Sequence, residues 1–343
     1  MAESLKNINP NYKKKSYRKY DLDECLAGIK TDRQILSFLI SKAESSRIED
    51  IAFVQQFLSK SKVTHSARRI AISGAPGVGK STFLNCFAKH LIDKNNKVAI
   101  LPVDPSSMVS KGSILGDKTR MDDLIGKELA YVKPMASALA LGGVAPASMV
   151  SQLLCERAGF DYIFLETVGV GQSEYEARHL VDCFILLLQP GGGDELQGIK
   201  RGIMEMADIL LINKVDGDNV AAANRSLKEY ASAARLMQKN NYGWKSSVGL
   251  YSGLSGEYNE KLQSLIEQYY SFLAEGSKID LLRKDQQKRY FQNEADKAIL
   301  QLVNRKESIS SARKNLEEEL LQNRIDPITA LLKFRENCED ELD

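Results

Sequence analysis

Short runs of apolar residues alternate with helical patterns through the middle of the chain, from about residue 67 to residue 274. Each run has the length of a β-strand and is bounded by Gly, Pro, Asp or Asn. The predicted strands are Ile70–Ser73, Val98–Val103, Tyr162–Glu166, Phe184–Gln189, Ile209–Asn213 and Val248–Ser252. Strands that are apolar throughout and separated by helices indicate a parallel sheet covered on both faces.

Helical periodicity replaces this alternation on both sides of the core. Between residues 21 and 66, apolar side chains such as Ile35, Leu39 and Leu58 recur at helical spacing. Beyond Ser277 there is no glycine, and the pattern predicts one or two long amphipathic helices, whose apolar stripe must pack on their own domain or on a second copy. We therefore expect four regions, which are a mobile basic arm (1–20), an N-terminal helical segment (21–66), an α/β domain (67–274) and a C-terminal helical extension (275–343).

Composition narrows the class of protein. The 343 residues are 43% apolar and 27% charged, which is typical of a globular chain. A formal net charge of +2 argues against a dedicated nucleic-acid binder, and no run reaches the ~18 apolar residues of a membrane span. Five cysteines without a CxxC pair suggest reduced thiols. We expect a cytoplasmic protein that binds neither nucleic acid nor membrane.

A glycine-rich loop follows the first predicted strand. Residues 74–81 read GAPGVGKS, which matches the phosphate-binding pattern GxxxxGK[ST], and a helical pattern follows it, as that motif requires. Glycines let backbone N–H groups converge on phosphate oxygens, and the helix N-terminus adds partial positive charge. We expect Lys80 to reach the β and γ phosphates and Ser81 to reach Mg²⁺. The predicted contacts in this loop are Gly74, Ala75, Pro76, Gly77, Val78, Gly79, Lys80, Ser81 and Thr82.

Acidic residues stand where two other predicted strands end. Asp104 and Glu166 close their strands, and the carboxyl ends of parallel strands converge on the ligand crevice. Asp117 lies in a polar, glycine-bearing loop that could serve as a mobile switch. Mg²⁺ takes few protein ligands, so not all three acids can bind it directly. We predict Ser81, Asp104 and Glu166 at the metal, and Lys80, Asp104, Asp117 and Glu166 as the catalytic groups.

A second motif points to the base of the nucleotide. Asn213, Lys214 and Asp216 form an NKxD pattern after the strand that begins at Ile209. An aspartate can accept hydrogen bonds from the guanine N1–H and 2-amino groups, whereas adenine offers no such donor pair. Ser252 and Gly253 follow the next strand, where guanine-binding proteins bring a backbone N–H to the base oxygen. The order of these motifs predicts GTP and GDP, rather than ATP, as ligands.

Four segments resemble one family of GTPases. They read DPSS (104–107), GSILGDKTRM (112–121), ETVGVGQSE (166–174) and GDELQGIKRGIME (193–205). They are similar to the MeaB/ArgK/MMAA family, SIMIBI-class GTPases that act as chaperones for adenosylcobalamin-dependent acyl-CoA mutases, chiefly methylmalonyl-CoA mutase. The resemblance covers residues 21–274 well and the helical tail loosely.

The resemblance implies a fold, a partner and further residue roles. The expected fold is α/β, a three-layer P-loop NTPase core with a mostly parallel sheet, an N-terminal helical segment and a C-terminal helical extension that forms a homodimer. Gly169 matches the second switch. The chain departs from the family pattern at Lys111 and around Ala138 and Leu139. The intact switch sequence after Asp117 predicts that hydrolysis survives, and the departures bear on how the nucleotide state reaches the mutase.

Three other classes of function stay open at this point. A GTPase that inserts metal into urease or hydrogenase should carry a His/Cys cluster, and the three histidines lie far apart in sequence. A small-molecule kinase should lack the NKxD motif. A nucleotide-binding scaffold without significant catalysis would need only the helical surfaces.

Overall fold

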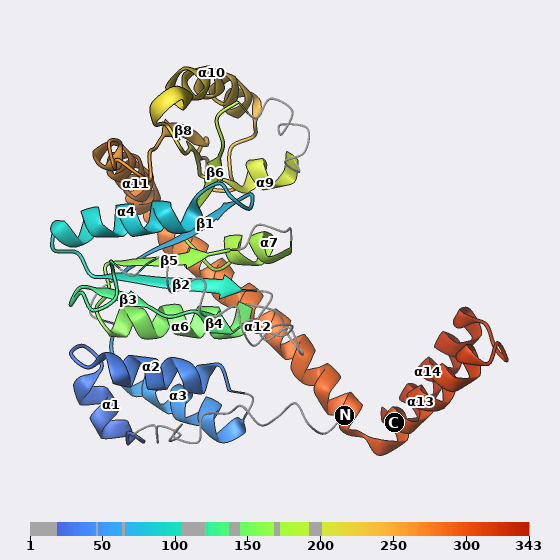
Figure 1. The fold of residues 1–343 in the computed structure, drawn as a ribbon. Coiled ribbons are helices and arrows are strands. Elements are labelled where there is room, and N and C mark those ends of the chain that lie inside the picture. The colour runs from blue at the N-terminus through green and yellow to red at the C-terminus, as the bar shows by residue number, and fades with distance from the viewer. Residues whose placement is uncertain are drawn as a thin grey trace, which may run out of the picture.

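The computed structural model describes residues 19–45, 47–63, 66–104, 121, 123–136, 145–167, 172–191 and 201–342. Its centre is a parallel β-sheet in the strand order β3-β2-β5-β1-β6-β7-β8, and β4 pairs with the end of β2 (Figure 1). The strands are β1 (Arg68–Gly74), β2 (Val98–Asp104), β3 (Ala130–Val132), β4 (Met135–Ala136), β5 (Tyr162–Glu166), β6 (Cys183–Leu188), β7 (Ile209–Ile212) and β8 (Ser247–Leu250). The predicted α/β class and parallel sheet are confirmed.

Alternate residues of each strand point to opposite faces of the sheet, and both faces are buried. Ile70 belongs to one apolar cluster, and its neighbour Ala71 belongs to the other. Helices α4 (Lys80–Asp93) and α11 (Asn259–Ala274) cover the first face. Helices α6 (Ala145–Arg157) and α10 (Val220–Leu236) cover the second, which completes three layers.

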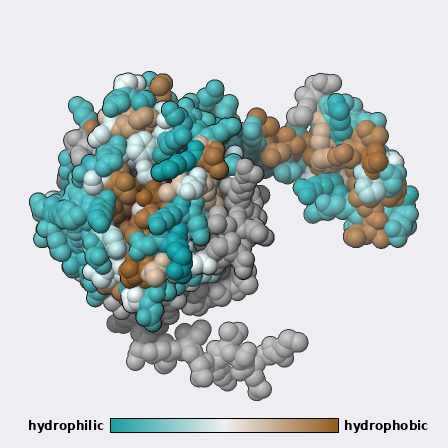
Figure 2. Space-filling model, turned by 90° about the horizontal axis from the view of Figure 1, so that it is seen from above, coloured by the Kyte–Doolittle hydropathy of each residue, from teal (hydrophilic) through white to brown (hydrophobic). Residues whose placement is uncertain are grey.

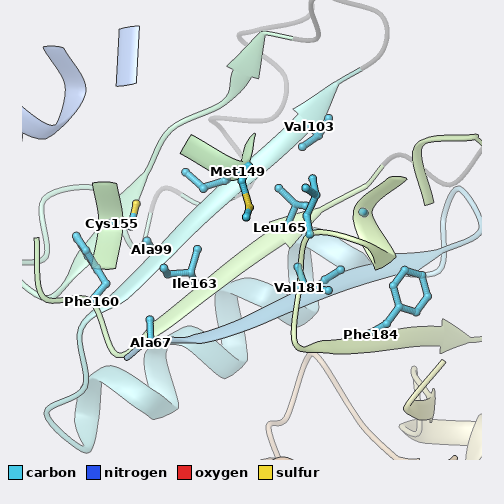
Figure 3. Close-up of a cluster of buried hydrophobic side chains, with 14 of the residues drawn as sticks. Ala67, Ala99, Val103, Met149, Cys155, Phe160, Ile163, Leu165, Val181 and Phe184 are labelled. Atoms are coloured by element: carbon cyan, nitrogen blue, oxygen red, sulfur yellow. The ribbon is translucent and has the colours of Figure 1, made fainter. Parts of the chain in front are cut away.

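The N-terminal helices α1 (Leu22–Gly28), α2 (Arg33–Ala43) and α3 (Ile48–Lys60) lie beyond α6, on which α2 packs, and they join the same apolar cluster (Figure 1). Figure 3 shows part of this cluster, where Ala99, Ile163 and Leu165 of neighbouring strands gather beside Met149 and Cys155 of α6. The Ser37 and Tyr131 hydroxyls lie 3.0 Å apart, which links α2 to the β3 edge. The N-terminal helices thus extend the hydrophobic core of the domain.

The C-terminal region forms three helices, and our expectation of one or two was wrong. They are α12 (Lys278–Arg305), α13 (Glu307–Leu321) and α14 (Pro327–Leu342). The first break falls at Lys306, which has an extended backbone (φ −69°, ψ 120°). No glycine or proline stands there to indicate the break from the sequence. The second contains Asn323 at φ 54°, a left-handed conformation that asparagine tolerates better than most residues. Helix α12 leaves the core, and the α13–α14 hairpin lies at its far end (Figure 1).

Two other differences from the predicted elements are small. Strands β3 and β4 have three and two residues, too few for an apolar run to reveal them. Strand β5 has the predicted bounds, and the ends of the other predicted strands differ from the prediction by at most two residues. No helix in the described part of the chain is both long enough and apolar enough to span a membrane.

Candidate nucleotide site

The glycine-rich loop lies at the carboxyl end of the central strand. Strand β1 ends at Gly74, and α4 begins at Lys80. Gly74 (φ 149°) and Gly79 (φ 96°) adopt backbone conformations that other residues rarely take. A Cβ on Gly74 would also lie only 2.6 Å from the carbonyl oxygen of Leu187 on β6. These positions therefore require glycine, and the loop between them presents backbone N–H groups beside a helix N-terminus.

Lys80 is held over this loop by backbone carbonyls. Its Nζ donates to the oxygens of Gly74 at 2.7 Å and Ala75 at 3.2 Å. Burial lowers the pKa of Lys80, while the carboxylates of Glu166 and Glu174 oppose that shift. The ammonium group is thus kept within the loop that would cradle phosphates.

Ser81 and Glu166 meet beside the loop. The Ser81 hydroxyl donates to Oε1 of Glu166 at 3.1 Å. Glu166 ends β5, which pairs with β1 so that Glu166 lies opposite Ile72. A hydroxyl and a carboxylate at this distance are hard oxygen donors of the kind Mg²⁺ prefers. Their chemistry fits the predicted metal site.

Three predicted site residues are described in part or not at all. Asp104 is the last residue of β2, and its backbone pairs with Ala136 of β4, but its side chain lies outside the described atoms. Asp117 and Gly169 lie outside the described residues. Their roles stay predictions.

The predicted base motif lies against the phosphate loop. Asn213 is buried, with 1% of its surface exposed, and its Nδ2 donates to the carbonyl of Val78 at 2.9 Å. Lys214, the next residue, has a left-handed backbone (φ 61°), and a Cβ on Gly79 would lie 3.9 Å from its Cε. The structure therefore brings the two motifs together on one face, as a single nucleotide requires.

The end of β8 completes this arrangement. The Ser252 hydroxyl donates to Oδ2 of Asp216 at 2.8 Å, which fixes one oxygen of that carboxylate. Gly253 lies against α4, since a Cβ added there would come within 3.2 Å of the Phe83 nitrogen and 3.4 Å of Thr82. Asn213 thus anchors one base segment to the phosphate loop, Gly253 anchors the other to α4, and the Ser252–Asp216 bond joins the two segments.

One contact beside the loop was not predicted from the sequence. Glu174, on α7 (Gln172–Arg178), is 3% exposed, and its Oε1 accepts a 2.6 Å hydrogen bond from the hydroxyl of Ser73. Glu174 stands in the segment ETVGVGQSE, but nothing in the local pattern distinguishes it from a surface acid. Only the packing of α7 against β1 reveals it.

Comparison with known proteins decides the family. A family model described as "Methylmalonyl Co-A mutase-associated GTPase MeaB" matches residues 36–308. The chain belongs to the MeaB family. This confirms the resemblance inferred from the sequence, and the chain is a P-loop GTPase by family and fold.

Individual relatives of the MeaB family agree. The chain is 42% identical over 260 residues to a mouse protein, "Methylmalonic aciduria type A homolog, mitochondrial", a match that covers 76% of this chain and 62% of the mouse protein. It is 38% identical to "GTPase ArgK" of Escherichia coli over 78% of this chain and 81% of that protein. A crystal structure described as "LAO/AO transport system kinase" superposes with a TM-score of 0.71 at 29% identity, covering 92% of this chain and 96% of that one.

Proposed function

We propose that this chain hydrolyses GTP while bound to an adenosylcobalamin-dependent acyl-CoA mutase, most directly methylmalonyl-CoA mutase, and that it gates loading, protection or exchange of the mutase cofactor. The family description supports association with that mutase. The observation that best supports GTP binding and hydrolysis is the 2.9 Å hydrogen bond from Asn213 to Val78, which joins the base motif to the phosphate loop.

The proposed division of labour follows from the site. The phosphate loop binds and orients the triphosphate, and Lys80 offsets charge that develops on its β and γ phosphates. Ser81, Asp104 and Glu166 would hold Mg²⁺, which supplies charge neutralisation at the phosphates when bound. Asp117 and Glu166 would serve the attacking water, and Gly169 would contact the γ-phosphate side.

Slow turnover in isolation is part of the proposal. Charge stabilisation by an arginine supplied from a partner accelerates related GTPases by large factors. No built-in arginine finger stands out in the sequence itself. The mutase is therefore expected to change the rate at which this chain hydrolyses GTP, and the nucleotide state in turn to change the mutase complex.

The C-terminal hairpin supports a homodimer. Ile328, Leu331 and Leu332 on α14 are 72%, 67% and 57% exposed. Figure 2 shows apolar surface on this arm, away from the core. A second copy would cover such a surface.

All five cysteines are free thiols, which fits a reducing compartment such as the cytoplasm.

Base recognition is tested by Asp216→Asn, with Asp218→Asn as a matched control. Asp218 lies two residues along, on an exposed turn. The amide cannot accept from both guanine donors, so Asp216→Asn should lose affinity for GTP and gain affinity for xanthosine triphosphate, while the control keeps the parental preference. Competition binding against ATP, GTP and xanthosine triphosphate measures this. A parent that binds ATP as tightly as GTP would contradict the base assignment.

The partner is tested by affinity capture from a lysate supplied with cobalamin. Recovery of an acyl-CoA mutase, in an amount that differs between GDP and a non-hydrolysable GTP analogue, is the expected result. Cofactor exchange on that complex, followed by the absorbance of adenosylcobalamin, then tests gating. Capture of a urease or hydrogenase maturation complex instead would favour the metal-insertion class.

A further inference from the structure

A buried acid on α7 lies next to the phosphate loop without belonging to its motif. Glu174 is 3% exposed, and its partner Ser73 is fully buried. Their 2.6 Å hydrogen bond joins α7 to β1 at the residue directly before Gly74. Burying a carboxylate is costly, and an apolar pair of the same shape would pack there without that cost. The acid is therefore a candidate for a role beyond packing.

Ser73 stands between the anchors of two predicted catalytic groups. Ile72, directly before it, pairs with Glu166 across the sheet. Gly74, directly after it, accepts the 2.7 Å hydrogen bond from Lys80. A constraint on Ser73 is thus a constraint on the backbone that holds both Lys80 and Glu166. The Glu174 carboxylate also favours the ammonium form of Lys80.

The far end of α7 is fixed as well. Arg178 donates to Oδ1 of Asp208 at 3.3 Å, and Oδ2 of Asp208 accepts from the backbone N–H of Phe184 at 2.9 Å. Asp208 is 1% exposed and precedes β7. Helix α7 is therefore tied near β7 at Arg178 and to the end of β1 at Glu174, so its position and that of the adjoining phosphate loop depend on each other.

We propose that Glu174 is a positioning residue for GTP hydrolysis: through Ser73 it holds the phosphate-loop backbone so that Lys80 and Glu166 keep the geometry that the reaction needs. This inference rests on the proposed hydrolysis of GTP at this site. Glu174 acts through Ser73 and need not touch the nucleotide. Its removal is expected to slow the chemical step while binding, which depends on the whole loop and the base motif, is largely kept.

The test is Glu174→Gln, with Glu176→Gln as the matched control on the same helix. Glutamine keeps the shape and can still accept from Ser73, but it removes the charge that strengthens the bond. We expect kcat for GTP to fall roughly tenfold, while KM and the affinity for a fluorescent GDP analogue change by less than about twofold. The melting temperature should stay close to that of the parent, and the control should match the parent throughout.

A double-mutant cycle with Ser73→Ala separates positioning from general loosening. Because the proposed effect of Glu174 passes through its hydrogen bond with Ser73, the double variant should be no slower than the slower single variant. If the fold reductions in kcat of the two single variants multiply in the double variant, the inference is overturned. So would parental kcat in Glu174→Gln, or a fall in kcat matched by equal falls in GDP affinity and melting temperature.

The parent enzyme is assayed first, because its behaviour distinguishes the two proposals. A parent that binds but does not turn over GTP contradicts the proposed function, and with it this inference. If the parent turns over GTP and the Glu174→Gln variant has the same kcat, only the positioning role is contradicted.

Discussion

Buried charges occur at both ends of the sheet, but they are arranged differently. At the amino end, Arg69 and Arg283 both pair with Glu156. Arg69 donates to the two carboxylate oxygens of Glu156 at 3.0 and 2.7 Å. Arg283 also bonds both oxygens of Asp182, at 2.9 and 2.7 Å. At the carboxyl end, Glu166 and Glu174 accept from serine hydroxyls, and Lys80 bonds to backbone carbonyls.

The difference separates a structural network from a binding site. The amino-end network, Arg69, Glu156, Asp182 and Arg283, places two guanidinium groups opposite two carboxylates and fastens α12 to the core. In this network each buried charge already has a partner of opposite sign. At the carboxyl end, Lys80 can exchange its carbonyl partners for phosphates and Glu166 can exchange its serine hydroxyl for a metal, while Glu174 keeps Ser73.

The largest expected effect is on the carboxyl end. Lys80→Ala removes the cation that would offset charge on the transferred phosphate, so kcat/KM for GTP should fall by about 10²–10³-fold. The melting temperature should change little, because Lys80 donates to backbone carbonyls of its own loop. Steady-state phosphate release and thermal unfolding measure the two quantities. A large loss of stability in Lys80→Ala would mean that the carboxyl end of the sheet is also structural, like the amino end.

The opposite result is expected at the amino end. Arg283→Met leaves Asp182 with an uncompensated buried charge, which should lower the free energy of unfolding by about 3 kcal/mol. Because Arg283 lies at the other end of the strands, kcat per folded molecule should match the parent. Urea denaturation and active-site titration with GDP test this. Lower kcat at parental stability would mean that the network also serves the reaction.

The smallest effect concerns His179, at the end of α7. Burial, with Arg289 and Arg178 nearby, lowers the pKa of His179, so the unfolded chain binds its proton more readily than the folded chain. Its contribution to stability is therefore present above pH ~6.5 and is lost as the pH falls below that value. His179→Gln should show a smaller drop in melting temperature than the parent between pH 7.5 and pH 5.5. An identical fall in melting temperature in both proteins would show that protonation of His179 does not affect the stability of the fold.

Local patterns predicted much of this molecule. The strands β1, β2, β5, β6, β7 and β8 each contain a short apolar run, and such runs are recognisable because a strand covered on both faces needs no polar side. The phosphate loop needs glycine at defined positions, so its eight residues identify it. The family followed from longer strings of the same kind. Strands of two or three residues and the break at Lys306 carry no such signal.

The chain alone thus determined the α/β class, the order of the motifs and the family, because each depends on neighbouring residues. Tertiary structure decided which distant side chains meet. Ser73 and Glu174 are 101 residues apart, and Val78 and Asn213 are 135 apart. Nothing near any of these residues encodes its partner, since a hydrogen bond forms where packed elements bring donor and acceptor together. The same holds for the ion network that fixes α12, whose four charged members come from four separate segments.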